Sequence, residues 1–190
     1  TDFPDGGYWF LRSGEAWAGV RAGMVSHHGA HAHCDQLSFV FSHGGEDFII
    51  DPGTGVYSPD PSKRNRYRSS DAHNACRING WEANSFRDGK FGMFRLDDDT
   101  QTEILDWQVH QSGASIGGRH RGYERFREGL IYERSMALRP ECLEIKDRFE
   151  SLQSGDRLDW SFHFAPRVDL AIEDGTIEAR SGSRKIRIIP

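Results

Sequence analysis

The chain has 190 residues, of which 36% are hydrophobic and 28% are charged, and its formal net charge is −5 at pH 7. This length suits a single domain with a core of its own. The small net charge gives no indication of nucleic-acid binding, and no apolar run approaches the roughly 18 residues of a membrane span. The 21 glycines and the 12% of aromatic residues favour turns and strands over long helices.

A period-two alternation of apolar and polar residues runs through much of the chain and predicts strands. Turn signals such as Asn79-Gly80 and Asp174-Gly175 separate these segments. Because no long amphipathic helix intervenes, the pattern predicts an all-β, layered antiparallel β-sandwich, with a barrel as the alternative. In chain order, the expected strands cover residues 17–22, 36–42, 47–50, 102–110, 130–138, 142–149, 158–164, 176–179 and 185–189.

Residues 1–190 are expected to form one domain that is part of a longer chain. The sequence begins at Thr1 without a methionine and stops directly after a strand-like run. The three cysteines, Cys34, Cys76 and Cys142, form no CxxC motif, so we expect free thiols or at most one disulfide.

Histidine and aspartate residues gather between the first two expected strands. In an extended backbone, His31, His33 and Asp35 project from one face. Asp51 ends an apolar strand at a turn, and His73 follows a later polar segment. Zinc takes imidazole and carboxylate ligands, often from strand ends and loops, and a His-x-His pair with a distant Asp and His can supply them. The alternative is structural: the histidines hydrogen-bond to the backbone and Asp51 caps a turn.

The polar segment 58–74 breaks the rhythm of strands and is predicted to be a long loop. Its centre carries four cations within six residues, from Lys63 to Arg68. A lone basic run is usually solvated. This run lies between Asp51 and His73, however, and arginine pairs bidentately with carboxylate or sulfate. We therefore favour an anionic partner for it.

Three segments carry a resemblance in a fixed order. They are Gly-Ala-His-Ala-His-Cys-Asp-Gln-Leu-Ser-Phe at 29–39, Ile-Asp-Pro-Gly-Thr at 50–54 and Tyr-Arg-Ser-Ser-Asp-Ala-His-Asn at 67–74. Together with the strand-like lead-in at 8–14, this series resembles the heparinase II/III-like polysaccharide lyases. Cys34 and Gln36 depart from the residues that are more usual there, which leaves the choice of substrate open.

The resemblance implies a supersandwich-like stack of sheets that follows an N-terminal (α/α) toroid, a domain that residues 1–190 lack. It implies that His31 is the histidine of the catalytic cleft, and that His33, Asp51 and His73 bind a structural Zn²⁺ ion. The implied partners are an acidic polysaccharide and the toroid of the same protein. The implied location is the periplasm or outside the cell, and the sandwich alone is expected to be inactive.

The implied reaction is β-elimination at a uronic acid, which needs a base for the proton α to the carboxylate and an acid for the departing oxygen. His31 suits the role of base or of charge neutraliser because imidazole has a pKa of roughly 6.5. Tyr67 is a candidate acid, although the resemblance places a stronger candidate on the toroid. We expect Arg66, Arg68 and Asn74 to bind the glycan.

Three other functions fit parts of the sequence. A non-catalytic carbohydrate-binding or structural sandwich requires none of the chemistry above. A cupin is suggested by His31-x-His33, but Glu46 follows thirteen positions beyond His33, which is too far for that motif. A glycoside hydrolase needs a facing pair of carboxylates, for which Asp35 and Asp51 are the candidates.

Overall fold

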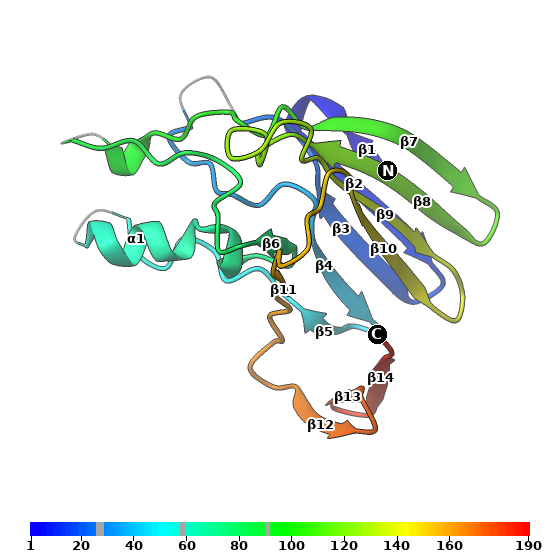
Figure 1. Cartoon of the computed structure of the whole chain (residues 1–190). Coiled ribbons are helices and arrows are strands. Elements are labelled where there is room, and N and C mark those ends of the chain that lie inside the picture. The colour runs from blue at the N-terminus through cyan, green and yellow to red at the C-terminus, as the bar shows by residue number, and fades with distance from the viewer. Residues whose placement is uncertain (26–28, 58–59, 90–91) are drawn as a thin grey trace.

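Antiparallel β-sheets are the main regular structure of the molecule, as the alternation predicts (Figure 1). This computed structural model describes residues 1–25, 29–57, 60–89 and 92–190. A five-stranded sheet has the order β1-β2-β3-β4-β5, and a four-stranded sheet has the order β10-β9-β8-β7. Their strands are β1 (Asp2–Phe3), β2 (Tyr8–Ser13), β3 (Ala16–Arg21), β4 (Ser38–His43), β5 (Glu46–Ile49), β7 (Glu103–His110), β8 (Gly113–His120), β9 (Tyr132–Leu138) and β10 (Leu143–Phe149).

The two large sheets pack face to face around the main core. Alternation along β2 turns Trp9 and Leu11 inward, and alternation along β9 turns Met136 and Leu138 inward. Burying side chains of this size stabilises the fold by about 1.5–3 kcal/mol each, which holds the sheets together. The expected β-sandwich is confirmed.

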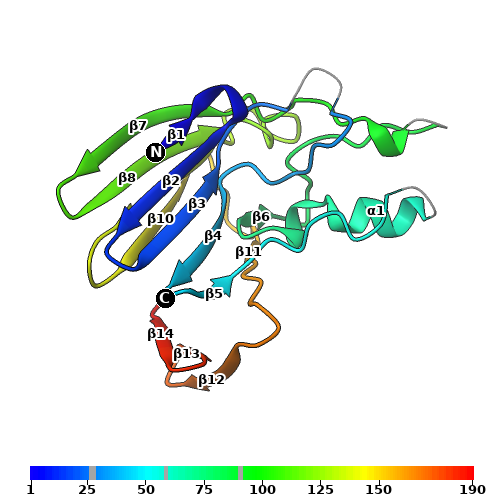
Figure 2. The ribbon, with the colours of Figure 1, turned by 180° about the vertical axis from the view of Figure 1, so that it is seen from behind.

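Two smaller sheets flank the sandwich. Strand β6 (Cys76–Ile78) pairs with β11 (Leu158–Trp160), so the expected strand over 158–164 is shorter than predicted. Strands β12 (Asp169–Glu173), β13 (Thr176–Ser181) and β14 (Arg184–Ile188) form a three-stranded sheet beside β5 (Figures 1 and 2). The hydroxyl of Ser181 donates to Glu46 at 2.9 Å and ties this small sheet to the large one.

The polar segment 58–74 is not only a loop, and its first two residues lie outside the described part of the chain. It contains helix α1 (Pro61–Tyr67) and the 3-10 helix η2 (Ser70–Ala72). Asp60 caps α1 by accepting a hydrogen bond of 2.9 Å from the backbone N–H of Lys63, and the proline that follows suits the first turn. The prediction of a loop was wrong there because a polar helix of two turns shows no apolar periodicity.

Strand β8 was not expected, because Gly113, Gly117 and Gly118 weaken the strand pattern. The structure gives a reason for one of them: a Cβ at position 118 would come within 2.8 Å of the Leu37 side chain. Strand β12 was also not expected.

Two remaining expectations concern the cysteines and membrane spans. All three cysteines are free thiols, and Cys34 and Cys76 are buried. The helices within the described residues include α1, η1 (Pro4–Gly6), η2 and η3 (Gly92–Phe94), and none of these is long and apolar enough to cross a membrane.

Candidate metal-binding and catalytic site

Most of the predicted site residues lie on loops at one end of the five-stranded sheet, whereas Arg66 and Tyr67 lie on α1 (Figure 1). Residues 29–37 lead into the start of β4, and residues 50–57 leave the end of β5, which lies at the same end because the two strands are antiparallel. Residues 73–74 precede β6. The first loop is held to the end of α1 by a hydrogen bond of 2.9 Å from the Cys34 N–H to the Arg68 carbonyl.

Three of the predicted residues converge at this end. Nδ1 of His73 lies 2.6 Å from Oδ2 of Asp51, and the rings of His33 and His73 have centroids 5.2 Å apart. The His73 side chain is completely buried, whereas that of Asp51 is 36% exposed. One side of the cluster therefore belongs to the protein interior and the other is open to solvent.

Burial and neighbouring charges affect these groups in different ways. Burial, together with the charge of His73, lowers the pKa of His33 to about 4, so this imidazole is neutral near pH 7. Burial also opposes a charge on His73, but the hydrogen bond with Asp51 and the nearby negative charges together outweigh it and raise the pKa of His73. Burial acts to raise the pKa of Asp51, yet the hydrogen bonds from His73 and from the Gly53 N–H, together with the nearby imidazole charges, lower it overall. His33 is therefore in the neutral form that binds metals.

The chemistry of this donor set fits a zinc ion, and one buried atom lacks a partner. The buried Nε2 of His73 has no hydrogen-bond partner in the described part of the chain, and it lies on the other side of the ring from Nδ1, which faces Asp51. An ion bound at Nε2 would leave Asp51 as a hydrogen-bonding partner of His73, whereas an ion bound at Nδ1 could be shared with Asp51. Among the residues that the structure describes, no three His, Cys, Asp or Glu side chains already form a metal-binding group. Tetrahedral zinc ligands are about 3.3 Å apart, so Asp51 and Nδ1 of His73 must separate by about 0.7 Å to share one ion.

His31 is exposed and lies in a turn, so the argument from an extended backbone over residues 31–35 is wrong. The turn is the physical reason that His31 and His33 lie in different surroundings. The His31 ring stacks on the ring of Tyr57, with centroids 5.8 Å apart and planes 22° apart. Tyr57 is 51% exposed. Sequence reasoning missed this tyrosine because no charge or spacing distinguishes it.

Two residues expected to bind the glycan are buried, Arg68 at 1% and Asn74 at 0% exposure. Nη2 of Arg68 donates to the carbonyls of Gly92 and Arg95 at 3.2 and 3.0 Å. The expected direct contact with a sugar is not supported for Arg68 or Asn74, because their polar groups are turned into the protein.

Asn74 instead joins three segments of the chain. Its Nδ2 donates to a carbonyl of β4 and to the Ile50 carbonyl, both at 2.8 Å, and its Oδ1 accepts from the His163 N–H at 2.7 Å. Because Ile50 precedes Asp51 and Asn74 follows His73, this amide fixes the backbones of two predicted ligands relative to each other.

A buried ion pair supports the same loops from the four-stranded sheet. Arg134 on β9 is 3% exposed and donates to Asp147 on β10 through hydrogen bonds of 2.7 and 2.8 Å. Nη1 of Arg134 also donates to the carbonyls of Leu37 and Asn74, at 3.1 and 2.6 Å. Removing one partner of such a buried pair costs about 3–5 kcal/mol, so the loops depend on the second sheet for their position.

Arg66 and Tyr67 lie at the end of α1 and differ in exposure. Arg66 is exposed, and Tyr67 is half-buried. The Tyr67 ring covers Gly55, where an added Cβ would come within 2.5 Å of the ring, and where φ is 60°. Both features require glycine at position 55. Of the residues predicted on the basic run, these two have surface that a substrate can reach.

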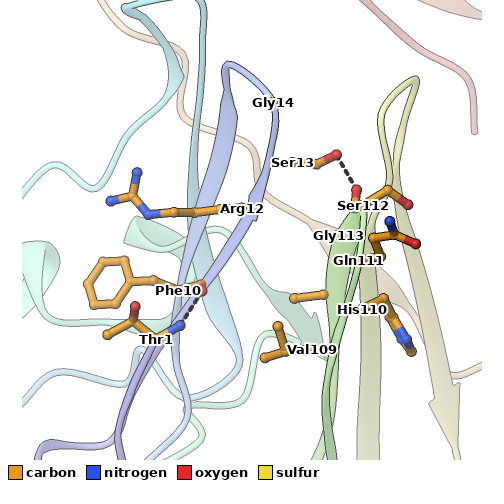
Figure 3. Close-up of a pocket in the computed structure, with 11 residues that line it drawn as sticks. Thr1, Phe10, Arg12, Ser13, Gly14, Val109, His110, Gln111, Ser112 and Gly113 are labelled. Carbon is orange, nitrogen blue, oxygen red and sulfur yellow. Dashed lines mark hydrogen bonds between the residues drawn. The ribbon is translucent and has the colours of Figure 1, made fainter.

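A separate pocket of about 300 Å³ lies between the β2–β3 hairpin and the β7–β8 hairpin (Figure 3). Phe10 and Arg12 contribute to its rim, but their side chains extend away from the β7–β8 hairpin, and Ser13 closes one side by donating to the Ser112 carbonyl at 2.6 Å. None of the predicted site residues lines this pocket. It is a gap between hairpins without a set of converging polar side chains.

The fold and the loop residues together define a β-sandwich domain with an imidazole and carboxylate cluster at one end. The chain belongs to the heparinase II/III-like family, because the family model described as "Heparinase II/III-like, C-terminal" matches residues 1–189. The resemblance drawn from three short segments is thereby confirmed.

Solved structures show the same fold. A mutant of the heparan sulfate lyase HepC from Pedobacter heparinus matches with a TM-score of 0.73 and 16% identity, over 92% of this chain and 26% of that chain. A heparinase III gene product, BT4657, matches with a TM-score of 0.71 and 17% identity, over 94% of this chain and 26% of that one. No curated protein gives a match. The chain thus spans about a quarter of the length of these solved structures.

Proposed function

We propose that the protein containing this chain is a polysaccharide lyase that cleaves uronic-acid-containing glycans by β-elimination. Family membership supports the class of enzyme. The observation that carries the proposal is the pairing of an exposed imidazole, His31 stacked on Tyr57, with the cluster of His33, Asp51 and His73, in which His33 lies two residues further along the same loop. This arrangement separates a group that can meet substrate from groups that can hold a metal.

In the proposed reaction, the C–H bond α to the uronate carboxylate breaks and its proton passes to a base. A C=C bond then forms as the glycosidic C–O bond breaks, and the departing oxygen takes a proton from an acid. We assign the base, or the group that neutralises the uronate, to His31. Tyr67 was the tyrosine expected from sequence, and the contact of Tyr57 with His31 makes Tyr57 a second candidate acid within this chain.

We assign a zinc ion to His33, Asp51 and His73, with a structural role. A bound zinc ion would supply a fixed link between the loop of His33 and the segment of His73. These three residues then hold His31 at a set position, because only Ala32 separates it from His33. The close approach of Asp51 to Nδ1 of His73 and the neutral state of His33 support this assignment.

The anionic glycan is assigned to the exposed part of the site. Lys63 and Arg66 are exposed cations on α1, and Arg66 can pair bidentately with a carboxylate or sulfate, while Arg68 and Asn74 support the loops from beneath. The remaining contacts fall to a toroid in the same protein. An enzyme for such polymers belongs in the periplasm or outside the cell, where they are encountered.

The test compares the intact protein with residues 1–190 alone, on heparan sulfate and on alginate. The expected result is new ultraviolet absorbance from the unsaturated uronate product with the intact protein and none with the isolated domain. A non-catalytic carbohydrate-binding domain is the second candidate, because half of an enzyme cleft can still bind sugar. It is favoured if the intact protein retains the glycan in a binding assay and releases no unsaturated product.

A further inference from the structure

We propose that Arg64 is a positioning residue that holds His31 against Tyr57, an inference that rests on the function proposed above. Arg64 lies in the basic run that was expected to meet an anionic glycan. It is only 2% exposed, because helix α1 turns this side chain inward while Lys63 and Arg66 stay exposed. A buried guanidinium costs free energy unless the protein supplies hydrogen-bond acceptors for it. The acceptors of Arg64 therefore indicate which segments it connects.

The hydrogen bonds of Arg64 connect the two loops that carry the substrate-facing rings. Nη2 donates to the Ala30 carbonyl at 3.1 Å, in the peptide unit that leads into His31. Nη1 donates to the Tyr57 carbonyl at 3.3 Å and to the Thr54 hydroxyl at 3.4 Å. One planar group thus sets the distance between the loop of residue 31 and the loop of residue 57.

The charge of Arg64 also lies against aromatic rings. Its Cζ is 4.9 Å from the centroid of the Tyr57 ring and 5.1 Å from that of Phe94, and these two rings are 5.5 Å apart. The Tyr57 ring therefore contacts the guanidinium as well as the His31 imidazole. Such cation–π contacts strengthen when they are removed from water, so the ring is held in place by both its backbone and its face.

Arginine is required for this arrangement because of its shape. The guanidinium presents donors in a rigid plane that can reach acceptors on two loops while its flat face covers a ring. A lysine ammonium at the same place keeps the charge but lacks the planar set of donors. It can therefore hydrogen-bond to one loop and not to the other. The consequence for the proposed reaction is that loss of Arg64 displaces His31 from Tyr57 without removing either group.

The experiment uses the intact protein with Arg64→Met and Arg64→Lys, and with Arg187→Met as the control at an exposed arginine on β14, outside the basic run. Catalysis on heparan sulfate or alginate is measured as kcat and KM, and each variant is also measured for zinc content and melting temperature. We expect Arg64→Met to lower kcat by about 10- to 100-fold, the scale for a catalytic group displaced by about 1 Å. Zinc content should stay at the wild-type level, Arg64→Lys should recover part of kcat, and Arg187→Met should match wild type.

Several results would overturn the proposal. One is a wild-type kcat in Arg64→Met, and another is a loss of zinc in proportion to the loss of activity, which would mean that the whole site has collapsed. If Arg64→Met does not fold, Arg64→Lys decides: a reduced kcat at a wild-type melting temperature supports positioning, and a wild-type kcat refutes it.

The failure of the proposed function itself has a different signature, namely that the wild-type intact protein yields no unsaturated product from either polymer. The positioning role is then read from the NMR signals of the His31 ring in protein with labelled histidine. A change of these signals in Arg64→Lys but not in Arg187→Met supports the inference, and unchanged signals overturn it.

Discussion

Replacement of Asn74 with alanine tests whether one buried amide holds the metal cluster together. The side chain makes three hydrogen bonds, two of 2.8 Å as donor and one of 2.7 Å as acceptor, and it has no exposed surface. Each buried partner left unsatisfied costs about 1–3 kcal/mol. Some relaxation of the three segments is expected, so Asn74→Ala should lower the free energy of unfolding by about 4 kcal/mol, measured by urea denaturation.

The same substitution should weaken zinc binding, because Ile50 would no longer be fixed to the residue that follows His73. Gln108→Ala is the control, since that exposed amide on β7 donates only to its neighbour Asp106, at 3.0 Å, and its loss should cost less than about 0.5 kcal/mol. A loss below about 1 kcal/mol in Asn74→Ala, with wild-type zinc affinity, would refute the reasoning. It would mean that the loops keep their positions without the amide.

Three further predictions concern single residues. His73→Ala should release zinc completely, as measured by metal analysis after dialysis, and full zinc retention with unchanged melting would remove His73 from the ligand set. Asp51→Asn should release zinc as completely, whereas retention with affinity weakened about 10- to 100-fold would make Asp51 a hydrogen-bonding partner behind His73. For His120, burial lowers the pKa to about 3. As pH falls, the unfolded chain therefore protonates His120 before the folded chain does. The free energy of unfolding should then decrease between about pH 6.5 and about pH 3, by up to roughly 4–5 kcal/mol. His120→Asn should flatten this dependence in metal-free protein, and an unchanged slope would show that other groups cause it.

Much of the two large sheets could be predicted from the sequence, most clearly where one face of a strand is buried. In β9, the alternating positions Tyr132, Arg134, Met136 and Leu138 are all buried, so the period-two pattern is strong. Strand β8 had no such signal because glycines interrupt it, and one of them, Gly118, makes room for the Leu37 side chain from a distant loop. Close approach of this kind depends on tertiary contacts that a local pattern does not contain.

The candidate site could be predicted only in part, and the basic run shows why. Composition identified four cations between Lys63 and Arg68, but it did not show that α1 turns Arg64 and Arg68 into the protein. The backbone of residues 31–35 was likewise interpreted as extended, which hid the different surroundings of His31 and His33. Residue types therefore indicated the chemistry, whereas the direction of each side chain required the fold.

His33 is assigned to the metal and His31 to the substrate, and this separation of roles leads to one last expectation about the isolated domain. His33, Asp51 and His73 belong to this chain, and so do Asn74 and the Arg134–Asp147 pair that support them. The proposed zinc site should therefore form in residues 1–190 without a toroid. If a toroid supplies the rest of the proposed cleft around His31, the same domain should bind zinc and remain inactive as a lyase. Zinc binding that appears only in the intact protein would contradict this separation, because it would place a ligand or a support of the site outside this chain.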